Sequence, residues 1–525
     1  NSKIIPLLQI IDKLCVSEFK RNFVSLQIKM RVAVIGAGVA GLCSTHFLKK
    51  EFPDAEVIIF EATDNVGGTW NYSDATKDEE FDIPMMSSMY KNLRTNLPKA
   101  VMTFSDYPIA DSYQTFMTDE DYLKYLNSYA KHFDIERHLK YRHYVTKVKL
   151  VEGGWEVGYR DLRGEMEHEE RFDYVYVCNG HYNHVFTPEY KGQDLFKGSQ
   201  IHSHNYRRPE VYKNKKVLVV GAGPSAQDIS IDVARECKTL FMSHHSPKLP
   251  SPYPPHFQQR PDVRELTANS VVFVDGTTEE IDDILYCTGY GYYSPFLDEN
   301  CDLHIERTHI RYLYRHIVNI EHPTMFFIGI PQLCCAIPLM DMQARYTVAI
   351  IKGSFKLPSK DDMMTHWRMT YEERKKLRRK KFDTHNLGGL EYYRDIAAES
   401  GVAPVPKVFC DIREDSMQTK VNLYTYRNWN YTVIDNETFV KTYAGENNYQ
   451  LTKCNVAHAN VMLHTINAMC NIMLRTCNVM LYTCNVMLHS CNVLQCCVNV
   501  YKRKKRLTEA ISSLRLHINY SVTKN

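Results

Sequence analysis

The chain has 525 residues, of which 44% are hydrophobic and 24% charged, a length and composition that suit two or three globular domains. Its formal net charge of +3 argues against a dedicated nucleic-acid-binding protein, and we expect no nucleic-acid partner. None of the 16 cysteines stands in a C-x-x-C pair, so we predict no metal site, and the scattered thiols are typical of a reduced cytoplasmic protein.

Residues 1–29 precede the first regular pattern and are interpreted as an N-terminal extension. They hold a short apolar run, IIPLLQII, without the small-residue cleavage pattern of a secretory signal. We therefore predict no signal peptide, and we expect the first domain to begin at Met30.

A strand, a glycine turn, a helix and a second strand are predicted in that order after Met30. The β-branched run over residues 31–35 ends at Gly36, apolar residues at helical spacing extend to Lys50, and a strand covers residues 57–60. This order is that of one βαβ unit of a parallel sheet.

The glycine turn has the spacing Gly36-x-Gly38-x-x-Gly41. The first glycine permits a tight turn, Gly38 lets the backbone approach a pyrophosphate, and Gly41 lets the helix pack closely on the sheet. Glu61 follows at the end of the second strand, where a carboxylate accepts hydrogen bonds from ribose hydroxyls. The pattern predicts a dinucleotide-binding site.

The same order of elements returns over residues 216–242, with a strand, a glycine turn, a helix to about Glu236 and a strand from Thr239. No acid follows at the place that matches Glu61; the chain reads SHHSPK instead, which favours a 2′-phosphate and hence NADPH over NADH. The two histidines of that stretch could equally be ordinary loop residues. The residues proposed for this second site are Gly221, Gly223, Ser225, Ala226, His244 and Lys248.

Two apolar strands, residues 173–178 and 282–287, end in glycine turns and bracket the second unit. We therefore predict that the second domain is inserted in the first, and that a last strand over residues 325–330 returns to the first sheet. The fold class is α/β, with two Rossmann-like dinucleotide-binding domains. The proline-rich stretch 247–261 is predicted to be a surface loop.

Residues 446–525 form a tail of different character. CNIMLRT, CNVMLYT, CNVMLHS and CNVLQCC repeat with a period of seven from Cys470, without the a/d spacing of a coiled coil. We interpret the tail as a low-complexity extension. Its uncharged stretch, residues 476–501, raises the alternative of an anchor in a membrane such as the endoplasmic reticulum, but the recurring asparagines oppose it because polar groups are costly in lipid.

One segment distinguishes among the flavoenzymes that carry two such glycine turns. Residues 196–206 read FKGSQIHSHNY, which fits F-x-G-x-x-x-H-x-x-x-Y with His202 and Tyr206 at its last two fixed positions. Here the chain resembles the flavin-containing monooxygenases, whose identifying motif this is. In physical terms Gly198 permits a turn, and His202 and Tyr206 could form hydrogen bonds between the two domains.

Further stretches are similar to the same family between Met30 and Ala444, and the similarity is greater to insect than to vertebrate members. They are VGGTW at residues 66–70, NLRTNLPK at 92–99, YCTGY at 286–290 and LMDMQARY at 339–346. The resemblance implies a catalytic role for Asn96, although a plain turn asparagine is the other interpretation. The cofactor-binding residues that it adds are Gly68, Thr69, Trp70, His202, Tyr206, Thr288, Gly289 and Gln343.

The resemblance implies FAD in the first domain (residues 30–182 and 291–445) and NADPH in the second (183–290). It implies that a 4a-hydroperoxyflavin transfers one oxygen atom of dioxygen to a nucleophilic nitrogen or sulfur, so that the partners are small amines or sulfides. A Baeyer–Villiger monooxygenase or an NADPH oxidase is one alternative, and a non-catalytic flavoprotein is another. The sequence does not decide between a monomer and a homodimer.

Overall fold

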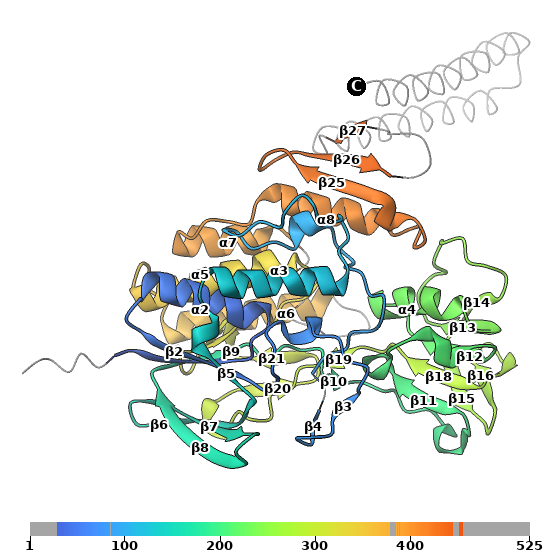
Figure 1. Cartoon of the computed structure of the whole chain (residues 1–525), viewed down its shortest axis with the longest axis horizontal. Coiled ribbons are helices and arrows are strands. Elements are labelled where there is room, and N and C mark those ends of the chain that lie inside the picture. The colour runs from blue at the N-terminus through green and yellow to red at the C-terminus, as the bar shows by residue number, and fades with distance from the viewer. Residues whose placement is uncertain are drawn as a thin grey trace, which may run out of the picture.

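The structure is a computed structural model, and it describes residues 29–84, 86–377, 385, 387, 389–444 and 451–454. Nearly all of the predicted N-terminal extension and tail lies outside these residues. The described chain forms two lobes, each built on a mainly parallel sheet (Figure 1). No helix of the described residues is long and apolar enough to cross a membrane.

A seven-stranded sheet organises the first lobe, in the order β22-β23-β24-β9-β1-β2-β5. The neighbours β24-β9, β9-β1, β1-β2 and β2-β5 pair in parallel, and β22 and β23 are antiparallel additions at one edge. The bounds are β1 (Arg31–Ile35), β2 (Glu56–Glu61), β5 (Leu139–Tyr141), β9 (Tyr174–Val177), β22 (Leu313–Tyr314), β23 (Val318–Asn319) and β24 (Met325–Phe327). The strands predicted over 31–35, 57–60, 173–178 and 325–330 all lie in this sheet.

Helices α2 (Val39–Glu51) and α5 (Ala336–Lys352) pack against each other on this sheet and share its largest apolar core. Helix α3 (Asp119–His132) adds its three tyrosines to the same core, and the Thr118 side chain caps its N-terminus by accepting from the Asp121 amide. The other long helices of the described chain are α6 (Lys360–Leu377), α7 (Glu391–Ser400) and α8 (Lys407–Thr419).

The second lobe has a five-stranded parallel sheet in the order β11-β18-β12-β13-β14, with α4 (Pro224–Ala234) following β12. The bounds are β11 (Ser199–His202), β12 (Lys216–Val220), β13 (Thr239–Ser243), β14 (Phe257–Arg260) and β18 (Asp283–Tyr286). The prediction of a surface loop over the whole of 247–261 is wrong for β14. Prolines flank this strand, which is possible because it lies at an edge of the sheet.

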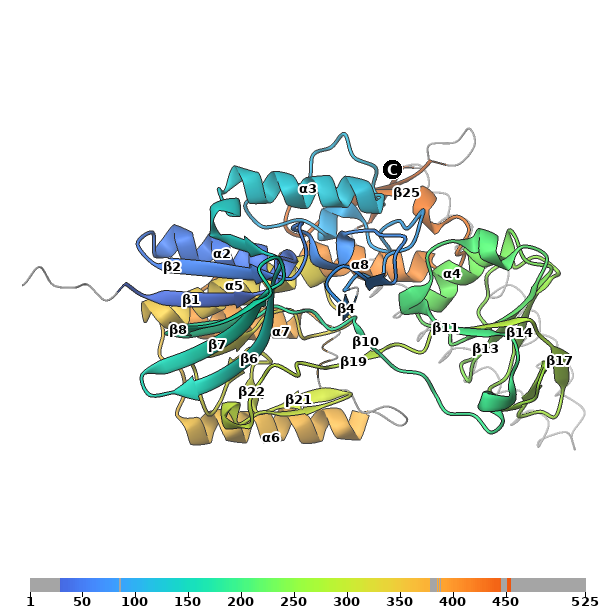
Figure 2. The same cartoon turned by 60° about the horizontal axis from the view of Figure 1, so that its bottom comes forward.

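Two short strands join the lobes. β10 (His184–Val185) leaves the first lobe, β19 (Tyr290–Gly291) returns to it, and the two pair antiparallel. Figure 2 shows β10 and β19 between the lobes. The fold is therefore α/β with two Rossmann-like domains, the second inserted in the first, as predicted.

After α8 the chain forms η8 (Tyr426–Asn428) and the antiparallel sheet β25-β26-β27. Its strands are β25 (Trp429–Val433), β26 (Phe439–Tyr443) and β27 (Leu451–Cys454), the last of which lies in the range assigned to the tail. The remaining described strands are β3 (Lys77–Asp78), β4 (Ile83–Pro84), β6 (His143–Val151), β7 (Gly154–Asp161), β8 (Met166–Phe172), β15 (Val263–Leu266), β16 (Ser270–Phe273), β17 (Thr278–Glu280), β20 (His304–Glu306) and β21 (His309–Arg311). Short 3-10 helices are η1 (Gly68–Trp70), η2 (Lys99–Val101), η3 (Glu136–His138), η4 (Gln193–Leu195), η5 (Ser203–Asn205), η6 (Pro209–Tyr212) and η7 (Glu299–Cys301).

Candidate functional site

The first loop, between β1 and α2, contains three glycines that are required on different physical grounds. Gly36 has a φ of +102°, and a Cβ on Gly41 would stand 2.0 Å from the Gly36 carbonyl oxygen, so the fold itself requires both. Gly38 has an ordinary φ of −75°, and its Cβ would meet nothing nearer than the Gly68 Cα at 3.6 Å. The protein does not explain this glycine, whereas a pyrophosphate at the N-terminus of α2 does.

Glu61 closes the same loop. Its side chain is buried, and its carboxylate accepts from the Ala37 amide at 2.8 Å and from the amide and hydroxyl of Thr63 at 2.9 and 2.8 Å. Burial raises the pKa of Glu61, and these hydrogen bonds oppose that rise. Since a carboxylate has about four lone-pair sites, room remains for a ribose hydroxyl.

The segment Gly68–Trp70, which forms η1, lies against this loop. The Gly67 amide donates to the Ala37 carbonyl oxygen at 2.9 Å, and Gly68 has a left-handed φ of +55°. The Thr69 carbonyl accepts from the Ser87 hydroxyl at 2.7 Å, and the Trp70 ring packs 4.3 Å from that of Tyr122 on α3. The structure thus brings Gly68, Thr69 and Trp70 together with the first glycine loop.

Asn96 is exposed, on a turn whose neighbouring residues are firmly held. Thr95 forms two hydrogen bonds with Met117, through its amide at 2.8 Å and its hydroxyl at 3.0 Å, just before α3 begins. Trp70 therefore packs on α3, and the Asn96 turn is bonded to the segment that leads into that helix. Among the described residues the exposed Asn96 side chain has no hydrogen-bond partner.

The second loop, between β12 and α4, repeats the pattern of the first with more open space. Gly221 has a φ of +119°, and its Cβ would stand 2.4 Å from the Cys287 carbonyl oxygen. A Cβ on Gly223 would meet no atom within 4 Å. Ser225 follows in the first turn of α4, and Ala226 is fully buried beneath it. Gly223 therefore leaves a cradle at a helix N-terminus, as Gly38 does.

Comparison with known proteins decides which family uses this pair of loops. The family model described as flavin-binding monooxygenase-like matches residues 29–248 and 255–439. The chain belongs to this family.

Two relatives support the same assignment. The chain is 35% identical over 422 residues to senecionine N-oxygenase of Tyria jacobaeae, across 79% of this chain and 92% of that protein. The structure of S-allyl-L-cysteine S-oxygenase of Allium sativum matches with a TM-score of 0.71 and 33% identity, across 76% of this chain and 95% of that one. A cyclohexanone monooxygenase, at 16% identity and a TM-score of 0.54 over 71% of this chain and 98% of its own, shares the fold alone.

This flavin-binding monooxygenase is an oxidoreductase that uses FAD and NADPH. The two cradles fit these cofactors, because each combines a glycine that the protein does not require with a helix N-terminus. The cofactor expected at the first cradle is FAD, whose ribose would bind Glu61. The cofactor expected at the second is NADPH.

The residues beyond the second loop divide into buried and exposed ones. His244 is buried, and its two ring nitrogens lie 3.0 Å from the Ser246 carbonyl and 3.0 Å from the Gln259 side-chain oxygen. His244 therefore shapes its own loop, whereas His245 and Lys248 are exposed and able to approach a 2′-phosphate.

The family motif behaves differently from the prediction. Tyr206 donates to Asp232 at 2.8 Å within the second lobe, and His202 accepts from the His204 amide at 3.1 Å, so neither hydrogen bond joins the lobes. Gly198 lies at a bend before β11, where its Cβ would stand 1.9 Å from the Asp282 carbonyl oxygen. The expectation of hydrogen bonds between domains from these two side chains is wrong, because both are buried against their own sheet and helix.

Arg207, which the sequence analysis missed, makes hydrogen bonds between the lobes. Its guanidinium donates to the His204 carbonyl at 2.7 Å and to the Ala75 carbonyl of the first lobe at 3.0 and 3.2 Å. Its own carbonyl accepts from the Lys91 amide at 2.8 Å. The one feature of the sequence that could have indicated Arg207 is its position directly after Tyr206, the final aromatic residue of the motif.

Three further predicted residues, Thr288, Gly289 and Gln343, form hydrogen bonds with backbone groups. The Thr288 hydroxyl donates to the Phe186 carbonyl, and the Gly289 carbonyl accepts from the Phe186 amide at 3.0 Å, which fixes the two connecting strands. Gln343 is fully buried; it accepts from the Gly329 amide at 2.8 Å and donates to the Tyr392 hydroxyl at 2.9 Å. In this structure Gln343 supports the Gly329 backbone and the Tyr392 hydroxyl, and its contact with a cofactor stays a prediction.

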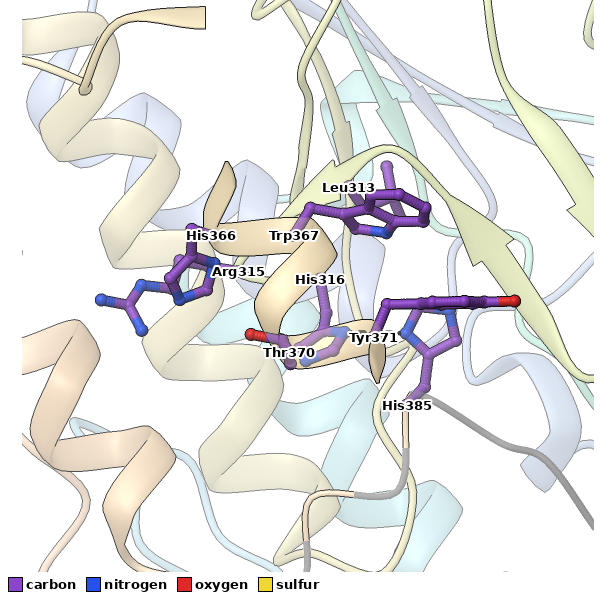
Figure 3. A pocket seen from close by; sticks show the side chains of 8 residues that line it. All are labelled: Leu313, Arg315, His316, His366, Trp367, Thr370, Tyr371 and His385. Carbon is purple, nitrogen blue, oxygen red and sulfur yellow. Dashed lines mark hydrogen bonds between the residues drawn. The ribbon is translucent and has the colours of Figure 1, made fainter. Parts of the chain in front are cut away.

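A cavity lined by three histidines lies between β22 and α6 (Figure 3), and its lining includes no residue of either glycine loop. The Ile310 amide donates to His385 Nε2 at 2.9 Å, so His385 carries its proton on Nδ1 and donates to His316 Nδ1 at 2.9 Å. The cavity holds about 10 Å³, about enough for one water molecule. Within the described residues no three His, Cys, Asp or Glu side chains are arranged to hold a metal ion.

Proposed function

We propose that this flavin-binding monooxygenase oxygenates a nucleophilic nitrogen or sulfur atom of a small molecule, with FAD, NADPH and dioxygen. The observation that carries the proposal is the pair of glycine cradles, at Gly38 and Gly223, one on each lobe. The relatives supply the chemical class, since one is named as an N-oxygenase and another as an S-oxygenase.

FAD reduced by NADPH supplies the chemistry, which is the activation of dioxygen for transfer to a soft nucleophile. No protein nucleophile is needed for such a reaction. The tasks of the protein are to bind both cofactors, to exclude water and to hydrogen-bond the oxygen that is transferred.

We assign the last of these tasks to Asn96. Its exposed amide can donate and accept without titrating, and the bonds of Thr95 to Met117 fix the turn that carries it. Removing one such donor typically costs roughly 3 kcal/mol, about a hundredfold in rate. An Asn96→Ala variant should therefore retain FAD and accept electrons from NADPH, but release hydrogen peroxide in place of oxygenated product.

The test is a panel with a tertiary amine, a thioether and a cyclic ketone, in which NADPH consumption, oxygenated product and hydrogen peroxide are all measured. Product from the amine or thioether supports the proposal, and product from the ketone alone would indicate a Baeyer–Villiger enzyme. Peroxide without any product would indicate an oxidase, and a colourless purified protein would indicate a chain without a working flavin site. Asn127→Ala, an exposed asparagine on α3, is the matched control for Asn96.

A further inference from the structure

The C-terminal segment after α8 meets both lobes at the Asn96 turn. Arg427, in η8, donates from Nε to the Thr95 carbonyl at 3.3 Å and from Nη2 to the Arg94 carbonyl at 3.1 Å. Its Nη1 donates to the Asp228 carboxylate on α4 at 2.8 Å. One guanidinium thus binds the two carbonyls that precede Asn96 and the helix that starts at the second glycine loop.

The other oxygen of Asp228 is also occupied by the first lobe. It accepts from the Tyr90 hydroxyl at 2.6 Å. The buried Tyr90 ring stands edge-on to that of Tyr206 at 5.4 Å, and Tyr206 in turn donates to Asp232, one turn further along α4. Helix α4 is therefore fixed to the Asn96 region by a carboxylate that binds two partners from outside its own lobe.

The pair is well shielded from solvent. The side chains of Arg427 and Asp228 are 19% and 23% exposed, and the Arg427 guanidinium lies 4.8 Å from the centre of the Tyr426 ring. Burial by itself would lower the pKa of Arg427, but Asp228, together with Tyr426 and Tyr90, outweighs burial and the pKa is raised. Tyr426 packs edge-on against Phe116 at 5.4 Å, and the carbonyl of Phe116 accepts from the Arg94 side chain.

These contacts leave little freedom for the Asn96 turn. Arg94 and Thr95 are bonded on one side to the segment before α3 and on the other to Arg427. A lysine could not replace Arg427, because one ammonium group lacks the planar fork that binds a carboxylate and two carbonyls together. A second contact of the C-terminal segment with the second lobe, Ser251 bonded to Val421 and Leu423, holds Arg427 in place.

We infer that Arg427 is a positioning residue, which sets the place of the Asn96 turn relative to helix α4 and so links the NADPH lobe to the site of oxygen transfer. The inference rests on the proposed function, because it gives Arg427 its effect through Asn96. The side chain of Arg427 itself binds protein groups only, at the three atoms given above.

The experiment compares full-length Arg427→Met, Arg427→Lys and Asp228→Asn with the parent enzyme, on the substrate that the parent oxygenates best. For Arg427→Met we expect FAD content and the anaerobic rate of flavin reduction by NADPH to stay within about twofold, while the ratio of hydrogen peroxide to product rises roughly tenfold. For Arg427→Lys we expect a ratio of hydrogen peroxide to product between those of the parent and Arg427→Met. We expect the same for Asp228→Asn, because it keeps the bonds of Arg427 to the two carbonyls.

The control is Arg315→Met. Arg315 forms an equally buried ion pair with Glu399, at 17% and 16% exposure, with no described contact to the Asn96 turn. A merely structural role for Arg427 predicts that both Met variants lower the melting temperature and neither changes the peroxide ratio. That result would overturn the inference. An equal rise of the peroxide ratio in Arg427→Met and Arg315→Met would also overturn it. Should Arg427→Met fail to fold, the lysine and Asp228→Asn variants carry the same test.

A double variant separates this inference from the proposed function. If Arg427 acts through the turn, Arg427→Met combined with Asn96→Ala should be no more uncoupled than Asn96→Ala alone. A parent enzyme that oxygenates nothing in the panel would refute the proposed function. A coupled parent with an equally coupled Arg427→Met variant would refute only the role of Arg427.

Discussion

The two glycine loops share one pattern but end differently. In each, the amide of the first glycine donates to a carbonyl near the end of the neighbouring strand: Gly36 to Phe60 at 2.8 Å, and Gly221 to Ser243 at 2.9 Å. This register makes His244 the counterpart of Glu61. Glu61 reaches back to the Ala37 amide in its own loop, whereas the ring of His244 turns away toward Gln259.

The difference concerns which phosphate each loop can admit. A carboxylate at the end of β2 suits ribose hydroxyls and repels an additional phosphate, so the first loop is specific for a dinucleotide without one. After β13 the position that corresponds to Glu61 is held by His244 instead of a carboxylate, and the exposed His245 and Lys248 follow it. The second loop is therefore open to the 2′-phosphate that distinguishes NADPH from NADH.

The largest expected effect comes from closing the first cradle. In Gly38→Val the protein itself has room for the new Cβ, whose nearest atom would be 3.6 Å away, but the methyl groups would occupy the place of the pyrophosphate. We expect the variant to fold and its FAD content to fall at least roughly tenfold, because this glycine lets the backbone approach the pyrophosphate. The measurement is the ratio of flavin to protein absorbance after purification.

Gly41→Ala is the contrasting variant for that experiment. Its Cβ would clash with the Gly36 carbonyl oxygen at 2.0 Å, so the helix cannot pack and we expect loss of folded protein. A yellow Gly38→Val protein with full flavin content would show that the first loop does not hold FAD.

Closing the second cradle should have a smaller and different effect. Gly223→Val should stay yellow, since its Cβ meets no atom within 4 Å and the first loop is unchanged. We expect its KM for NADPH to rise roughly tenfold or more, because the side chain would stand at the N-terminus of α4. Anaerobic reduction followed at increasing NADPH concentration measures this, and unchanged saturation would remove the second loop from the NADPH site.

Much of this arrangement is local in the sequence and could be predicted from it. The β-branched runs 31–35 and 216–220, each followed by glycines at fixed spacing, determine both βαβ units, and two glycine-ended strands locate the insertion. The contacts between lobes could not be found in this way. Arg427 and Asp228 are 199 residues apart, and no periodicity relates them. Gln343 lies in a family-like stretch, yet sequence similarity does not reveal that its amide is fully buried.

The cation beyond the second loop should tune the preference between the nicotinamides. Lys248 is exposed, so an ion pair with the 2′-phosphate is partly screened by water and contributes little. Lys248→Ala should lower the preference for NADPH over NADH by roughly fivefold or less, with flavin content unchanged. Stopped-flow reduction with each nicotinamide gives the ratio. Equal affinity of the parent enzyme for both would contradict the contrast between the loops, whereas an unaltered ratio in the variant alone would shift the role to His245.

The smallest effect concerns the buried titratable groups of the two lobes. The second lobe buries His202 at the end of β11, where burial, followed by the nearby His204, lowers its pKa to about 4. An unfolded histidine has a pKa near 6.5, so between about pH 6.5 and 4 the unfolded chain binds a proton that the folded chain does not. Above that window His202 does not lower the free energy of unfolding. As the pH falls through the window the free energy of unfolding decreases, by about 2 kcal/mol at pH 5.

In His202→Gln, the denaturant midpoint should therefore fall less between pH 7 and pH 5 than in the parent. Other buried histidines act equally in both proteins, so their effect cancels in the comparison. Parallel pH dependences would mean that His202 is protonated in the folded enzyme, and that its neighbourhood is more polar than the structure indicates.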